Sequence, residues 1–206
     1  MGDVGAPVRR ASAEGWGLLL PASWWTIDLR TGAARRRSVT GLVHQQVGRG
    51  DERASLRADL RKHLDRVAED AAAAGGVFMA ICLMRVGDVA LPASVTVFRL
   101  RGADLTSQGV RELEATLRPG IAPGVSLDLA DGPSGPVLRR VSQRFGSGEI
   151  GAGDVPLVLA DYWVDPGDGR GLLYLSFSSP LVQAREPLLY LFDMVVTSVG
   201  PVAGAA

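Results

Sequence analysis

The sequence has little that would fix it covalently or place it in a membrane: one cysteine, one lysine and no long hydrophobic run. One thiol cannot form an internal disulfide. Cys82 lies inside an apolar segment, where cysteine usually acts as a small hydrophobic residue. No stretch approaches the ~18 apolar residues of a membrane-spanning helix, so we expect no membrane span. The N-terminal region lacks the apolar core of a signal peptide, and we expect a cytoplasmic protein.

The chain also lacks an excess of either charge. It has 22 basic and 22 acidic side chains in 206 residues. A protein that neutralises nucleic-acid phosphates usually shows a basic excess, and we therefore expect no nucleic-acid partner. The run Arg35-Arg36-Arg37 is open to two interpretations, a patch for phosphate or an acidic partner and a solvated turn, and the balanced charge favours the turn.

A chain of this length is typical of one domain and buries roughly 70% of its unfolded surface without a metal or disulfide. We expect a flexible N-terminal tail over 1–14, a single α+β domain over 15–200 and a flexible C-terminal tail over 201–206. The tails are rich in glycine, alanine and proline, and such ends are often poorly ordered.

The most apolar segment, 77–84, contains eight uncharged residues between Gly75-Gly76 and Arg85. Its length and its apolar residues on both alternating faces are typical of a strand that is covered on both sides. We predict a central strand with helices packed above and below it. The following segment, 89–100, is predicted to pair with it as a hairpin, with Pro92 delaying the start of the second strand.

Three helices are predicted, over 51–74, 106–118 and 187–199. The first begins at Asp51 as a cap and ends at Gly75 as a left-handed cap, and the second begins at Thr106. The first helix has an apolar stripe at spacings of three and four, made of Leu56, Leu60, Leu64, Val67 and Ala71.

Further strands are predicted over 15–20, 24–29 and 38–46, and two more hairpins over 125–130 with 136–145 and over 156–164 with 171–177. Alternating apolar residues and the turn residues between the segments support this reading. The predicted fold class is α+β: a largely antiparallel central sheet flanked by helices, an α-β-α sandwich.

No motif predicts a catalytic, cofactor or metal site. Residues 146–151 match G-x-G-x-x-G, but a strand is expected after them, whereas dinucleotide binding needs a helix there. His44 and His63 lack neighbours at metal-ligand spacing. The remaining pattern, Asp161, Asp165 and Asp168, allows a calcium loop or an ordinary turn, and we favour the turn because the twelve-residue loop pattern is absent.

Two apolar features are predicted to contact a partner. Trp24 and Trp25 are adjacent and would point to opposite faces of a strand. The last helix is unusually apolar, with only a narrow polar strip at Tyr190, Asp193 and Thr197. The candidate partner-binding residues are Trp24, Trp25, Leu188, Phe192 and Val195.

The segments Leu20-Pro21-Ala22-Ser23-Trp24 and Phe177-Ser178-Ser179-Pro180, the latter followed by an apolar helix, resemble the two ends of PsbP-like α-β-α sandwich proteins. The resemblance implies an antiparallel sheet with helices on both sides. It also implies partner binding rather than catalysis, and it transfers no site residues. Many bacterial members are secreted or lipid-anchored, but no signal or lipidated cysteine is evident here.

Three functional hypotheses follow. The first is a non-catalytic cytosolic protein that binds another protein, as an accessory subunit or chaperone of a bacterial multi-protein system such as a secretion system. The second is an enzyme or small-ligand-binding protein with a pocket between sheet and helices. The third is a homo-oligomeric structural protein.

Overall fold

A computed structural model describes residues 8–48, 50–82, 85–86, 89–102, 107–146 and 155–202. Its centre is a seven-stranded, fully antiparallel sheet in the order β3-β4-β7-β11-β10-β9-β8. The strands, in that order, are β3 (Trp24–Asp28), β4 (Gly76–Cys82), β7 (Ser94–Leu100), β11 (Leu172–Ser179), β10 (Pro156–Val164), β9 (Gly135–Phe145) and β8 (Ser126–Gly132).

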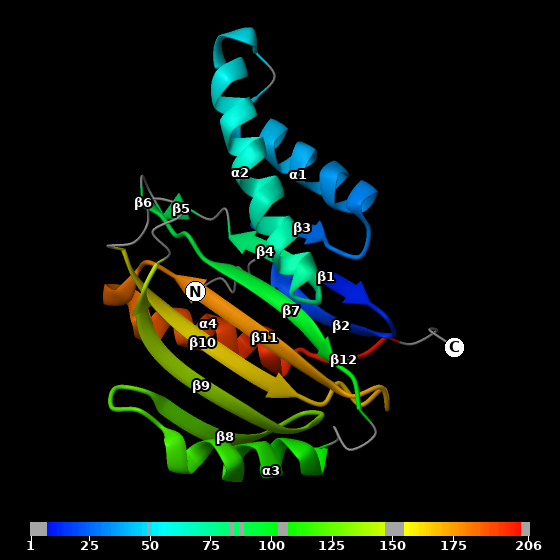
Figure 1. Cartoon of the computed structure of the whole chain (residues 1–206), viewed down its shortest axis with the longest axis vertical. Coiled ribbons are helices and arrows are strands. Elements are labelled where there is room, and N and C mark those ends of the chain that lie inside the picture. Colours follow the sequence, from blue (N-terminus) through cyan, green and yellow to red (C-terminus); the bar gives the residue numbers. More distant parts are fainter. Residues whose placement is uncertain are drawn as a thin grey trace, which may run out of the picture.

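A smaller sheet and four α-helices cover the large sheet on both faces (Figure 1). The smaller sheet, which we call the ribbon, has the order β1-β2-β12. Its strands are β1 (Val8–Ala13), β2 (Trp16–Pro21) and β12 (Gly200–Pro201), and β5 (Arg85–Val86) pairs with β6 (Val89–Ala90) separately. The helices are α1 (Gly32–Val47), α2 (Ala54–Ala73), α3 (Ser107–Leu117) and α4 (Arg185–Thr197), with short 3₁₀ turns η1 (Asp51–Arg53), η2 (Arg118–Gly120) and η4 (Val182–Ala184).

The helices divide between the two faces of the large sheet. Helix α4 and the ribbon cover one face, here the α4 face, where the largest hydrophobic cluster forms. Helices α1 and α2 pack on β3 and β4 at one end of the opposite face, and α3 packs on β8, β9 and β10 at the other end (Figure 1). The predicted α+β, α-β-α sandwich is therefore confirmed, and both later hairpins form as predicted.

The apolar segment at 77–84 is an interior strand, but its surroundings differ from the prediction. β4 lies second from the end of the sheet, between β3 and β7, while β11 is the middle strand. Helices α1 and α2 cover one of its faces, where Met79 is buried. The ribbon covers the other face, where the Trp16 ring stacks on Phe78 with 5.7 Å between ring centroids. Residues 83 and 84 lie outside the described part.

The prediction of a strand over 38–46 is wrong, because these residues belong to α1. Thr31 caps this helix: its Oγ1 accepts a hydrogen bond from the Ala34 amide at 3.2 Å. The β-branched residues favoured a strand, but the apolar positions recur with helical spacing and all face the sheet. They are Val39, Leu42, Val43 and Val47. The arginine run 35–37 thus lies on a helix, where Arg35 pairs with Glu69 of α2 at 3.5 Å.

The boundaries of the tail and of the long helix also differ from the predictions. Residues 8–13, expected in a flexible tail, form β1, because β2 offers them a complete antiparallel partner. Asp51 does not cap α2; it begins η1, and α2 starts at Ala54 without a side-chain cap. Leu56 is 57% exposed, while the rest of the predicted stripe packs on the cluster beneath α1 and α2. Gly75 adopts the predicted left-handed conformation, with φ of 89°.

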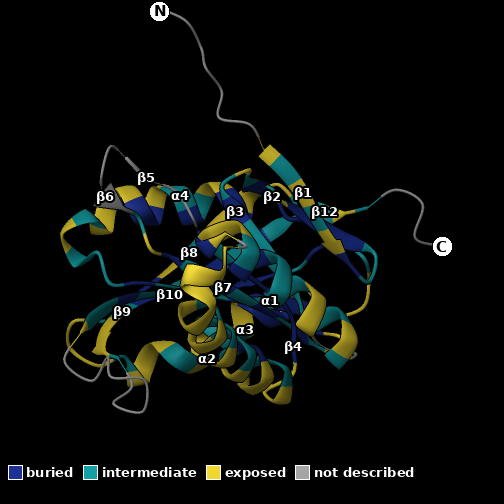
Figure 2. Cartoon of the chain, turned by 90° about the horizontal axis from the view of Figure 1, so that it is seen from above, coloured by how far each residue is buried: buried dark blue, intermediate teal, exposed yellow. Residues whose placement is uncertain are grey.

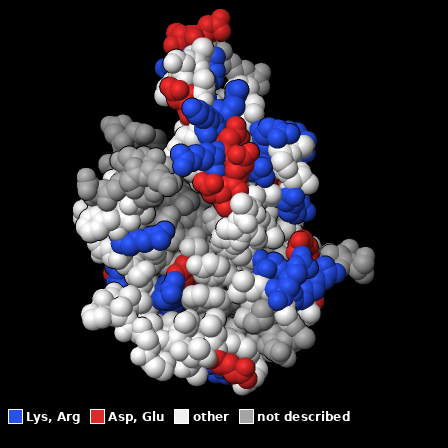
Figure 3. All heavy atoms as spheres, viewed as in Figure 1, with Lys and Arg blue, Asp and Glu red and all other residues white. Residues whose placement is uncertain are grey.

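The outward sides of α1 and α2 are exposed, whereas the strands beneath them are buried (Figure 2). Basic and acidic side chains alternate over these helices, and the sheet surface below them carries far fewer charges (Figure 3). Interspersed charges of this kind are typical of a solvated helix face.

A buried ion pair fastens the β10–β11 turn to β7. The side chains of Arg99 and Asp168 are only 1% and 7% exposed, and Arg99 Nη1 lies 3.1 Å from Asp168 Oδ1. Arg99 also donates to the Gly171 carbonyl at 3.2 Å and lies over the Trp16 ring. The pair therefore joins the large sheet, its turn and the ribbon at one point.

We expect Arg99→Leu to lower the free energy of unfolding by about 4 kcal/mol, because it leaves the Asp168 carboxylate buried without its partner. Arg30→Leu is the matched control. The Arg30 and Asp28 side chains are 51% and 32% exposed, so removal of this pair should lower the free energy of unfolding by less than about 1 kcal/mol. Denaturant titration of both variants measures the difference. Equal losses would show that the buried pair has no special role.

Candidate functional site

The exposed side of α4 differs from the side that the sequence analysis selected. Leu188, Phe192 and Val195 point into the core with exposures of 6% or less, and Trp24 is equally buried. Trp25 lies on the other face of the sheet, where its indole N–H donates to the Ser38 carbonyl at 3.0 Å. These five residues pack within the fold, although Leu188 and Val195 also line surface grooves beside α4.

The outward-facing residues of the same helix form an apolar surface. Tyr190 is 70% exposed and Met194 is 54% exposed, with Leu191 half-buried between them. Val8 and Leu19 of the ribbon are exposed beside them. We call these five residues the outer α4 surface. Tyr190 and Met194 are four residues apart, so helical periodicity places them on one stripe. Helix α4 therefore has one apolar side that packs on the sheet and a second that faces solvent.

Two apolar grooves flank this surface, and Leu191 lines both. One groove, of about 350 Å³, runs between α4 and the ribbon. The other, of about 250 Å³, lies beside the N-terminal half of α4. The first is lined by Val8, Leu19, Pro21, Leu191, Met194, Val195, Thr197 and Ser198, and the second by Cys82, Leu91, Ala93, Leu181, Ala184, Pro187, Leu188 and Leu191.

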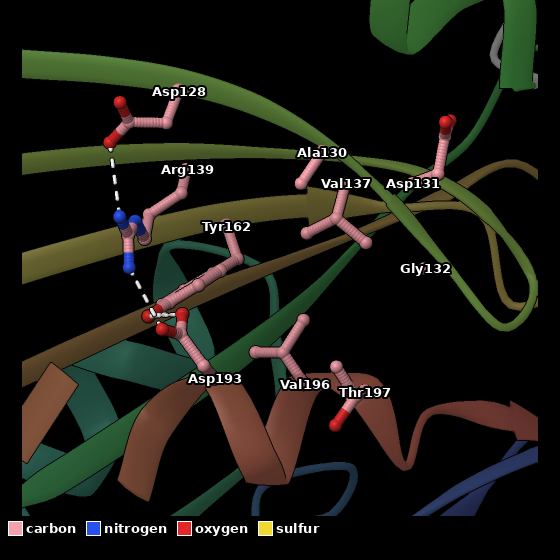
Figure 4. Close-up of a pocket in the computed structure, with 10 residues that line it drawn as sticks. All are labelled: Asp128, Ala130, Asp131, Gly132, Val137, Arg139, Tyr162, Asp193, Val196 and Thr197. Atoms are coloured by element: carbon pink, nitrogen blue, oxygen red, sulfur yellow. Dashed lines mark hydrogen bonds and ion pairs between the residues drawn. The ribbon is translucent and has the colours of Figure 1, made fainter. Parts of the chain in front are cut away.

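A third cavity, of about 320 Å³, lies between the C-terminal half of α4 and the last two strands of the large sheet, β9 and the edge strand β8 (Figure 4). We call it the Asp193 slot. Its walls are Ala130 and Val137 on the strands and Val196 on the helix, and polar side chains close one end (Figure 4). The complete lining is Asp128, Ala130, Asp131, Gly132, Val137, Arg139, Tyr162, Asp193, Val196 and Thr197.

The polar end of the slot is a continuous hydrogen-bonded chain. Arg139 donates from Nη1 to Asp193 Oδ2 at 2.8 Å and from Nη2 to Asp128 Oδ2 at 3.1 Å. The Tyr162 hydroxyl donates to Asp193 Oδ1 at 2.8 Å. The chain links β8, β9, β10 and α4, so it fixes the distance between the helix and the sheet edge at the slot.

The electrostatics of this chain keep both donors protonated. Burial raises the pKa of Tyr162, and the negative charge of Asp193 raises it further. Burial alone would lower the pKa of Arg139, but the carboxylates Asp193 and Asp128 outweigh it, and the pKa is raised. A tyrosine that holds its proton so firmly serves as a hydrogen-bond donor and not as a base.

A second polar network lies on the opposite face of the sheet and has a structural character. Asp161 is buried and accepts hydrogen bonds from Arg140, from the Tyr174 hydroxyl at 2.8 Å and from the Ser176 hydroxyl at 2.8 Å. Burial and the Asp161 charge raise the pKa of Tyr174 to about 12. These cross-strand contacts satisfy the carboxylate.

The three aspartates weighed as a calcium loop do not come together. Asp161 belongs to the network on the sheet, and Asp168 pairs with Arg99. Asp165 accepts from the Gly167 amide at 2.8 Å, as expected of an ordinary turn. The turn interpretation is therefore correct.

Other sequence candidates have an ordinary structural setting or cannot be placed. His44 lies on α1 and His63 on α2, and no group of three or more His, Cys, Asp or Glu in the described residues is arranged to hold a metal. In the G-x-G-x-x-G segment only Gly146 is described, and its amide donates to the Val155 carbonyl at 2.8 Å. Residues 147–151, like the predicted cap Thr106, lie outside the described ranges. The absence of catalytic residues and cofactors stays a prediction.

None of the described helices is both long enough and apolar enough to cross a membrane.

Comparison with solved structures finds proteins of similar fold. No family model and no curated protein sequence matches the chain. The fold is similar to the solution structure of cyanobacterial PsbP (CyanoP) from Synechocystis sp. PCC 6803, at 13% sequence identity and a TM-score of 0.43. The match covers 98% of this chain and 97% of that chain.

The raised pKa of Tyr162 predicts a loss of stability at alkaline pH. Because the folded chain holds this proton more tightly than the unfolded chain, stability is complete below pH ~10 and falls above it, by about 1.4 kcal/mol per pH unit for Tyr162. Tyr174 adds a smaller amount, because solvent reaches it.

Denaturant titrations between pH 9 and 12 measure this slope. We expect Tyr162→Phe to cost about 1 kcal/mol at pH 7 through the lost hydrogen bond and to flatten the alkaline slope. Tyr190→Phe, which removes an exposed hydroxyl, is the matched control and should leave the slope unchanged. A slope that is the same in both variants would contradict the assignment.

Proposed function

We propose that this chain is a non-catalytic protein-binding module, an accessory subunit or chaperone, and that it binds its partner through the outer α4 surface. The observation that carries the proposal is the combination of two large, exposed side chains, Tyr190 and Met194, with apolar grooves on both sides of the helix. Contiguous exposed apolar surface of this kind, with adjoining grooves, marks interaction sites.

The chemistry of this surface indicates the kind of partner that it accepts. Arg185 and Glu186 at the start of α4 pair with each other, and the partly exposed Asp193 farther along the helix is held by Arg139. Aromatic residues and methionine are enriched in the cores of interfaces, and methionine adapts to irregular partners. An apolar stripe on another protein, with side chains that enter the two grooves, is the expected occupant. The alternative occupant is a second copy of this chain, and the experiment below distinguishes it from a different protein.

Location and cellular setting belong to the same proposal. We keep a cytoplasmic location and a bacterial multi-protein system, such as a secretion system, as its expected context. Fractionation of cells that express a tagged full chain tests the location.

Site-specific photo-crosslinking in cells tests the surface itself. A benzoylphenylalanine placed at Tyr190 should give a discrete adduct with another protein, and Met194→Glu should abolish that adduct. The same probe at His63, on the exposed side of α2, is the matched control. Met194 is more than half exposed, so the glutamate should change the free energy of unfolding by less than about 0.5 kcal/mol, which a thermal melt checks.

Three results would contradict the proposal. Identical adducts at positions 190 and 63 would indicate non-specific contact. An adduct that survives Met194→Glu would place the contact elsewhere. An adduct between two copies of this chain, together with a dimer in light scattering, would favour the homo-oligomer.

A further inference from the structure

The Asp193 slot opens on the same helix as the outer α4 surface but has a different chemistry. Thr197 lines both the slot and the groove beside the ribbon. The slot is apolar along its walls, at Ala130, Val137 and Val196, and polar only at one end and at its rim. A partner on the outer α4 surface would therefore have this slot within reach of its edge.

The charge at the slot favours a cation. Two carboxylates, Asp128 and Asp193, line its polar end against a single guanidinium, Arg139, whereas the Asp131 carboxylate points away from α4 (Figure 4). Both terminal nitrogens of Arg139 already donate to carboxylates, so these carboxylates compensate the positive charge of Arg139. In the described part of the chain, Asp128 Oδ1 accepts no hydrogen bond, since Arg139 uses Oδ2. Asp131 pairs with the exposed Arg111 of α3, at 3.3 Å.

The shape of the slot favours an alkyl stem behind that cation. In liquid water each molecule occupies about 30 Å³. A cavity of about 320 Å³ therefore holds several carbon atoms and a hydrated head group. Lysine and arginine place their methylene stems against apolar surface while the charged group reaches polar atoms. The apolar walls and the acidic end of the slot match these two parts.

We propose that the Asp193 slot binds a lysine or arginine side chain of the partner that docks on the outer α4 surface. The stem packs against Ala130, Val137 and Val196, and the cation reaches Asp128 Oδ1 at the polar end (Figure 4). This inference rests on the proposed function for the partner, but the slot is testable without it. The partner segment then carries an apolar stripe with one basic residue beside it.

Amide chemical shifts of the full-length, ¹⁵N-labelled chain provide the test. The probes are n-butylammonium, its neutral isostere 1-butanol, the anion butyrate, and the peptide acetyl-Ala-Ala-Lys-Ala-Ala-amide with a norleucine version. Butylammonium and the lysine peptide should shift the amides of Gly132, Val196 and Thr197 saturably. Butanol and the norleucine peptide should bind about fivefold more weakly, the ratio expected for a half-exposed ion pair, and butyrate should not bind.

Variants locate the binding. Ala130→Leu fills the slot from an exposed edge-strand position and should remove all shifts, whereas Ala115→Leu, at an exposed position of α3, should leave them intact. Asp128→Asn should weaken the binding of butylammonium and of the lysine peptide, and it should leave the binding of butanol unchanged. Unchanged binding to the Ala130→Leu chain would place the ligand elsewhere and overturn the proposal.

Other outcomes overturn it in distinct ways. Equal binding of the lysine and norleucine peptides would exclude recognition of the charge. Binding of butylammonium without the lysine peptide would assign the slot to a free amine instead of a partner side chain. Failure of every probe would remove the slot as a site, while the adduct at Tyr190 would still support the partner surface. Loss of that adduct with the slot intact would reject the proposed function alone.

Discussion

The stacking of Phe177 on Phe192 is the contact on which the arrangement of this protein depends. Phe177 lies on β11, the middle strand of the large sheet, and Phe192 on α4, with 4.4 Å between their ring centroids. Trp24 and Tyr162 approach the same Phe177 ring edge-on, at 6.4 and 5.5 Å. Aromatic rings in such geometries contribute beyond their buried area. One cluster thus holds the helix, the centre of the sheet and its β3 edge together.

This cluster also sets the surfaces that are offered to solvent. With Phe192 directed inward, helical periodicity directs Tyr190 and Met194 outward. Tyr162 has its ring in the core and its hydroxyl on Asp193, so the core and the polar end of the Asp193 slot share a residue. The outer α4 surface and the slot are therefore two consequences of how one helix packs on the sheet.

Buried charge appears on both faces of the sheet, and in each case it joins separate segments. Arg99 and Asp168 connect β7 with a distant turn, and Asp161 gathers donors from two neighbouring strands. A buried pair gains little net stability over an apolar substitute, but removal of one partner is costly. Such pairs therefore specify which segments meet more than they stabilise the fold.

The sequence by itself determined the strands of the large sheet, most helices and the antiparallel sandwich, because the periodicity of apolar residues and the turn residues act locally. It misassigned α1, where β-branched residues outweighed a capped helical pattern, and it placed helices above and below β4 where the ribbon covers one side. For α4 it identified the apolar helix but selected its inward side, since composition does not reveal which stripe the core will cover. Only the tertiary structure decided the slot, because Asp128, Arg139, Tyr162 and Asp193 come from four elements whose side chains meet after the chain has folded.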